Sequence, residues 1–88
     1  MVKGSATVAS DVGLHARPAA DFVRAATLSQ HEVFVVNKQG KRASGLSILA
    51  ILSLGAKKGE ELVIEVTGPD EEVVLKSLID VVSNPVSQ

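Results

Sequence analysis

Residues 13–20 place a histidine, an arginine and a proline close together, in the order Gly-Leu-His-Ala-Arg-Pro-Ala-Ala. Proline is tolerated in the first turn of a helix, and apolar residues then recur at the spacing of one helical face: Ala19, Phe22, Val23 and Ala26. His15 is therefore predicted at a helix N-terminus, where free backbone N–H groups stabilise anions. Arg17 adds a guanidinium that can bind phosphate oxygens. The stretch predicts a phosphorylated histidine, and the alternative is a plain cap or surface histidine.

Composition excludes several classes of function. The 88 residues make one domain, 1–88, without cysteine, and His15 and His31 are not at metal-ligand spacing, so neither a disulfide nor a metal site is expected. A net charge of −1 and only two aromatic residues, both Phe, argue against nucleic-acid binding. The sequence contains no Gly-rich phosphate loop, so no cofactor is expected. No signal peptide precedes the first strand, and the apolar run 48–52 is too short for membrane insertion, so we expect a soluble cytoplasmic protein.

Periodicity predicts alternating strands and helices. Strands are expected over residues 2–8, 32–36, 41–43 and 61–67, and helices over 16–27, 48–54 and from 68–70 to Asn84. The order is β-α-β-β-α-β-α. The predicted fold class is α+β: a two-layer, open-faced sandwich with a four-stranded antiparallel sheet and three helices on one face.

The helix predicted over 48–54 has more apolar residues than its length can bury. Ser47 is a good N-cap candidate, and Gly55 suits the position after the helix. Two turns can bury one face, for which Ile51 and Leu54 are the candidates. The other apolar side chains either belong to the core or form an exposed patch of the kind that marks partner sites.

The segments 13–19 and 47–55 together resemble the two signatures of the HPr family, the histidine-containing phosphocarriers of the bacterial phosphoenolpyruvate-dependent sugar phosphotransferase system. The length and element order are also similar, so the resemblance covers nearly the whole chain. It implies that His15 accepts a phosphoryl group on Nδ1 from enzyme I and passes it to IIA domains of sugar permeases. It also implies a monomer in which Arg17 stabilises the phosphate.

The resemblance gives roles to further residues. It implies that Ser47 is a regulatory serine phosphorylated by HPr kinase/phosphorylase, although the family often has lysine where this chain has Leu46. It implies a partner-contact surface near His15, formed by Leu14, Ala20, Ile48, Leu49 and Leu52. Arg24 is interpreted either as a rim charge of that surface or as a solvated residue. Ser10 lies on the loop before the site, and His31 is expected at the surface.

Three other functions stay open. One is the nitrogen-type paralogue, a regulatory phosphocarrier with its own enzyme I. Another is a regulatory binding module that acts through Ser47, which would not need His15 and Arg17 together. The last is a small ligand-binding domain, which no pocket signal supports. As a carrier, the chain would be a substrate of its neighbours without independent turnover.

Overall fold

The fold alternates strands and helices in the predicted order. The structure is a computed structural model that describes residues 1–8, 16–57 and 59–83, with the side chains of residues 16–18 left outside this description. The strands are β1 (Val2–Thr7), β2 (Glu32–Val36), β3 (Arg42–Ser44) and β4 (Glu61–Thr67). The helices are α1 (Ala16–Ser29), α2 (Ile48–Leu52) and α3 (Glu71–Ser83).

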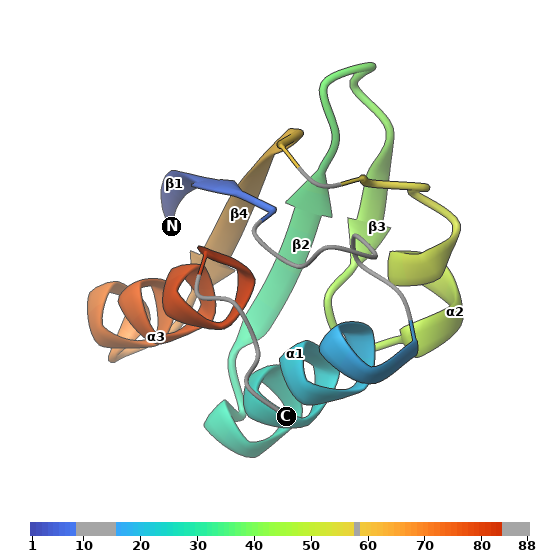
Figure 1. The fold of residues 1–88 in the computed structure, drawn as a ribbon. Coiled ribbons are helices and arrows are strands. Elements are labelled where there is room, and N and C mark those ends of the chain that lie inside the picture. Colours follow the sequence, from blue (N-terminus) through green and yellow to red (C-terminus); the bar gives the residue numbers. More distant parts are fainter. Residues whose placement is uncertain (9–15, 58, 84–88) are drawn as a thin grey trace.

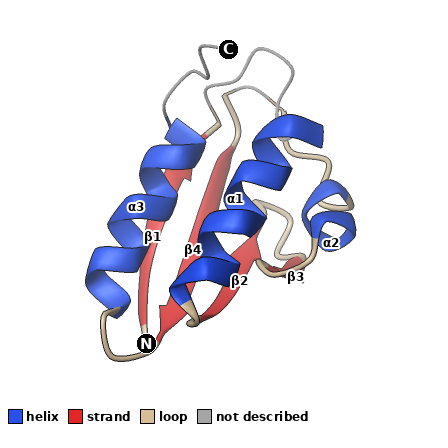
Figure 2. Cartoon of the chain, turned by 90° about the horizontal axis from the view of Figure 1, so that it is seen from below, coloured by secondary structure: helices blue, strands red, loops and turns tan. Residues whose placement is uncertain are grey.

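The four strands form one sheet in the order β1-β4-β2-β3, and every neighbouring pair is antiparallel. Within the sheet, β4 pairs with β1 through Ile64↔Gly4 and with β2 through Ile64↔Val35. α1 and α3 lie side by side over one face of this sheet, and α2 lies next to α1 (Figures 1 and 2). The architecture is the predicted α+β open-faced sandwich.

The core fills the space between the sheet and the two long helices. Alternate residues of β4 point into it, because successive strand residues face opposite sides of a sheet: Leu62, Ile64 and Val66 are at most 1% exposed. Phe22 of α1 and Leu78 of α3 close over them from the helical layer. The predicted burial pattern of this strand is confirmed.

Several element boundaries differ from the predictions by a few residues: β1 ends at Thr7 and α3 begins at Glu71. α1 continues to Ser29, whose hydroxyl donates to the Ala26 carbonyl, and the chain turns at Gln30 with φ of 59°. β3 is shifted by one residue because Ser44 pairs with Phe34. α2 ends at Leu52, so Gly55, with φ of 63°, lies two residues after the C-cap Ser53.

The prediction of a surface position for His31 is wrong. The residue is only 9% exposed, and it links the end of α1 to the turn before α3. Its Nδ1 lies 2.6 Å from the Ser29 carbonyl oxygen, and the Asp70 backbone N–H donates to Nε2 at 3.0 Å. Because a carbonyl only accepts, we assign the proton to Nδ1. The ring also packs on Gly68, where a Cβ would lie 2.2 Å from Cδ2.

On the open face of the sheet, Arg42 covers an aromatic ring. Its guanidinium carbon lies 3.8 Å from the centroid of the Phe34 ring, and its Nη2 is 3.1 Å from Oε1 of Glu65. The three side chains come from β3, β2 and β4, so they join neighbouring strands on the face without helices. Of the described helices, none has the length and apolar character needed to cross a membrane.

Gly45 provides a test of the packing between the sheet and α1. Its N–H donates to the Val33 carbonyl at 2.7 Å, and a Cβ here would lie 2.4 Å from Cγ1 of the buried Val33. We expect Gly45→Ala to lower the free energy of unfolding by about 1–3 kcal/mol, because β-branched Val33 cannot rotate away. Urea denaturation measures the change.

Gly4→Ala is the matched control, since its Cβ would meet the flexible ends of two side chains, Cδ1 of Ile79 at 2.9 Å and Cδ2 of Leu75 at 3.3 Å. A smaller loss is expected there. Equal losses in the two variants would contradict the packing argument.

Candidate functional site

The centre of the predicted phosphorylation site lies outside the described residues. His15, Leu14 and Ser10 belong to the segment 9–15, of which no structure is given. α1 begins at Ala16, the residue that follows His15, and Arg17 is in its first turn. A helix therefore starts where the sequence predicted one, while the placement of the imidazole and guanidinium groups stays a prediction.

The helix α2 separates its apolar residues into an inner and an outer set. Ile51 is fully buried and Leu54, just after the helix, is 7% exposed, as predicted. In contrast, Ile48 is 41% exposed and Leu49 is 80% exposed. Leu52 is half-buried, as is Ala20 on the neighbouring helix α1. The pattern alone allowed core or patch, and the structure contains both.

We call the exposed apolar side chains at the start of α2 the α2 patch: Leu46, Ile48 and Leu49. Leu46, which is 46% exposed, was not among the predicted contact residues. Its position in the loop before the N-cap gave no periodic signal. α1 packs against α2, and Figure 1 shows the beginning of α1 close to this short helix. The patch therefore lies on the same side of the fold as the helix start that follows His15.

Ser47 is the N-cap of α2. Its backbone is extended, with φ of −128° and ψ of 120°, and its Oγ accepts a hydrogen bond from the Ala50 N–H at 3.2 Å. The hydroxyl thus satisfies one of the free N–H groups at the helix start. The cap interpretation of Ser47 is confirmed, and its regulatory role stays a prediction.

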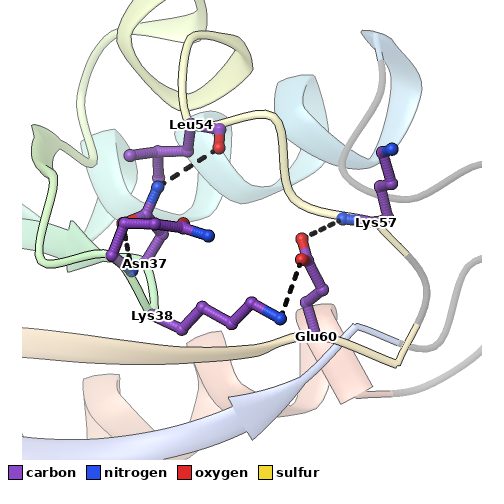
Figure 3. Close-up of polar contacts among 6 residues, drawn as sticks. Asn37, Lys38, Leu54, Lys57 and Glu60 are labelled. Carbon is purple, nitrogen blue, oxygen red and sulfur yellow. Dashed lines mark hydrogen bonds and ion pairs between the residues drawn. The ribbon is translucent and has the colours of Figure 1, made fainter.

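The other end of α2 is held by the turn between β2 and β3. Nδ2 of Asn37 donates to the Leu54 carbonyl at 3.3 Å (Figure 3), and Nζ of Lys41 donates to the Ser53 carbonyl at 3.0 Å. Gly40 has φ of 85° and closes this turn, as predicted. Two side chains from another element therefore bind the carbonyl groups that follow α2.

Glu60 attaches the loop after α2 to the same turn (Figure 3). Its carboxylate accepts from the Lys57 backbone N–H at 2.8 Å and lies 3.5 Å from Nζ of Lys38. The Lys57 hydrogen bond and then the Lys38 ammonium lower the pKa of Glu60 below its ordinary value of 4.5. The backbone of Glu60 and Gly59 pairs with Val8, the last described residue before the segment 9–15.

Arg24 is interpreted in the sequence either as a rim charge or as a solvated residue. Arg24 is exposed and pairs with Asp21 one turn earlier at 3.1 Å, so its described contact lies within α1. Within residues 1–8, 16–57 and 59–83, no three His, Asp or Glu side chains lie close enough to hold a metal ion. The described part of the site is thus an apolar contact surface beside a helix start, which suits a protein that docks on partners.

The chain is similar to known proteins. A model of the family described as "PTS HPr component phosphorylation site" matches residues 2–84. The phosphocarrier protein HPr of Streptomyces coelicolor is 42% identical over 71 residues, which are 81% of this chain and 76% of that protein. The phosphocarrier protein NPr of Escherichia coli is 35% identical over 78 residues, 89% of this chain and 87% of NPr.

Two further comparisons extend this result. The HPr-like protein Crh of Halalkalibacterium halodurans is 35% identical over 79 residues, 90% of this chain and 93% of Crh. The crystal structure of a phosphocarrier protein HPr from Bacillus anthracis matches with a TM-score of 0.87 and 34% identity, covering 93% of this chain and 96% of that one.

Fold and comparisons together define a phosphocarrier of the phosphotransferase system, built as an open-faced α+β sandwich. The chain belongs to the HPr family.

Ser47 offers a direct test of the cap. We expect Ser47→Ala to lower the free energy of unfolding by about 1 kcal/mol, the usual cost of removing a Ser N-cap. Ser47→Asp keeps an oxygen that can accept from the Ala50 N–H, so its stability should stay close to that of the original chain. Urea denaturation at neutral pH compares them, and an unchanged midpoint for Ser47→Ala would contradict the assigned hydrogen bond.

Proposed function

We propose that this chain is the phosphocarrier of a sugar phosphotransferase system, acting in the cytoplasm as a monomeric domain of residues 1–88. His15 takes a phosphoryl group from the phosphohistidine of enzyme I and gives it to IIA domains of sugar permeases. The observation that carries the proposal is the match over residues 2–84 to a family described by its phosphorylation site.

The chemistry asked of His15 is simple. In the first step the P–N bond at the donor imidazole of enzyme I breaks while a P–N bond forms at Nδ1 of His15. In the second step that bond breaks while a new bond forms between the phosphorus and the acceptor group of the IIA domain. Phosphoryl transfer needs positioning and charge stabilisation more than covalent help from the protein. The N–H groups at the start of α1 and the Arg17 guanidinium are the groups we assign to this task. Moderate stabilisation suits a carrier, which must release the phosphoryl group.

We assign docking to the α2 patch together with Leu14, Ala20 and Leu52. Leu49, at 80% exposure, presents nearly its whole side chain to solvent. Exposed apolar side chains at the side of a small domain gain free energy when a partner covers them. The same surface would serve enzyme I and the IIA domains in turn.

Ser47 is the proposed regulatory residue, phosphorylated by HPr kinase/phosphorylase. Its hydroxyl is half-buried in the cap, and Leu46 and Ile48 flank it in the sequence. A phosphate there would carry nearly two negative charges into the middle of the α2 patch and weaken apolar docking.

A nitrogen-type regulatory phosphocarrier is the second candidate. It is favoured by the 35% identity to the NPr protein of Escherichia coli, which extends over 78 residues. Both candidates use His15 in the same way, and they differ in which enzyme I supplies the phosphoryl group. A module acting only through Ser47 is the third, and it predicts no phosphorylation of His15 at all.

The first test is the intact mass of the chain after incubation with phosphoenolpyruvate and a catalytic amount of enzyme I. We expect one added phosphate, labile to acid, on the original chain and none on His15→Ala. Parallel reactions with the sugar-type and the nitrogen-type enzyme I of the same organism separate the first two candidates by rate. No added phosphate with either enzyme would refute the carrier function.

The docking surface is tested by Leu49→Ala. Since Leu49 has little contact with its own protein, the fold should be unaffected, while the KM of the chain as substrate of enzyme I should rise about tenfold, as for an interface anchor. Leu28→Ala is the matched control, because Leu28 is 76% exposed at the far end of α1. A similar KM in the two variants would remove α2 from the docking surface.

A further inference from the structure

The helix α2 is too short to hold itself in place. It has five residues, whereas isolated helices shorter than about 12–15 residues are marginal even with favourable sequences. One buried side chain within the helix, Ile51, fixes it to the core. Ala50 and Leu52 are only partly buried against the core, and Leu54 is buried just after the helix. Because this apolar attachment is small, the direction of the α2 patch also depends on what binds the two ends.

The two ends are bound differently. At the start, the Ser47 cap comes from the chain directly before the helix. After the end, the Ser53 and Leu54 carbonyls accept hydrogen bonds from Lys41 and Asn37, which belong to the β2–β3 turn. Lys41 also places a positive charge where the helix dipole is negative. The turn therefore ties α2 to the sheet, the rigid part of the fold.

We propose that Asn37 and Lys41 are positioning residues for docking: the β2–β3 turn sets the orientation in which α2 presents its patch to the phosphotransfer partners. This inference rests on the proposed docking function of that patch. It adds two polar residues, which lie outside the apolar surface, to the groups that determine partner affinity.

The Asn37 side chain uses its two ends for two tasks. Its Oδ1 accepts from the backbone N–H groups of Gln39 at 3.1 Å and Lys41 at 2.9 Å, which shapes the turn. Its Nδ2 faces the Leu54 carbonyl, so this orientation of the amide satisfies all three contacts. Aspartate keeps both acceptor contacts and replaces Nδ2 by an oxygen that repels the carbonyl. Asn37→Asp therefore breaks the link to α2 and keeps the turn.

A matched control lies between the two positioning residues. Lys38 is on the same turn, points to Glu60 at 3.5 Å and is 60% exposed. Asn37→Asp, Lys41→Met and Lys38→Met each change the net charge by −1. Any general electrostatic effect on docking is therefore shared by the three variants. Lys41→Arg keeps a cationic donor and serves as the conservative variant.

The experiment measures KM and kcat of each variant as a substrate of phosphorylated enzyme I. Asn37→Asp and Lys41→Met should raise KM about three- to tenfold with kcat unchanged, in line with the loss of one hydrogen bond each. Lys38→Met and Lys41→Arg should stay within about twofold of the original chain, since neither loses a bond to α2. Equal KM values for Lys41→Met, Asn37→Asp and Lys38→Met would overturn the inference.

Amide hydrogen exchange of the free chains separates this inference from the docking proposal. Residues 50–54 should exchange faster in Asn37→Asp and Lys41→Met than in Lys38→Met. Unchanged exchange refutes the positioning role whatever the kinetics show. Faster exchange together with an unchanged KM for Leu49→Ala means instead that the turn holds α2 and the docking proposal has failed.

Discussion

The pairing of β4 with two strands at once is the constraint on which the rest of the fold depends. β4 is the last strand in the sequence, yet it lies between β1 and β2. The sheet is therefore continuous only when β4 has paired with both of these earlier strands. Its inward residues, of which Ile64 is fully buried, are covered by α1 and α3. At its first residues, β4 continues from the loop that pairs with Val8. The chain just after β1, at Val8, is thus fixed by long-range contacts, and the segment 9–15 with the predicted phosphorylation site follows it in the sequence.

The same constraint leaves α2 in a different position from the other helices. α1 and α3 each have more than three turns and lie along the sheet, where apolar burial at about 25 cal/mol per Å² holds them. α2 lies at the side of α1, and it exposes Leu49 while burying Ile51. A helix whose apolar residues are exposed cannot use them for its own attachment. Polar contacts to Ser47, Asn37 and Lys41 supply what its buried face lacks.

Local chemistry made most of the fold predictable. The alternation over 61–67 predicts β4 with the same bounds that the structure shows, and Ser47 and Gly40 are recognisable because caps and tight turns demand particular residue types. His31 was misplaced because one of its partners, the Asp70 backbone N–H, lies 39 residues away and has no side-chain signature. The bond from Asn37 to Leu54 was missed for the same reason, since Asn in a turn is explained by the turn alone. The family resemblance, rather than periodicity, identified the exposed half of α2.

The separation between chemistry and docking follows from what a carrier must do. A group that binds phosphate strongly enough to hold a partner would also slow the next transfer. The phosphorylated carrier would then lie lower in free energy than both the phosphorylated donor and the phosphorylated acceptor. Affinity for partners is therefore better placed in contacts that do not touch the phosphate. In the proposed function, Ile48 and Leu49 would meet this condition, since both are exposed and neither side chain has a group that can bind phosphate. Orientation then matters more than strength, because the proposed docking has to align His15 first with the phosphohistidine of enzyme I and then with the acceptor group of the IIA domain.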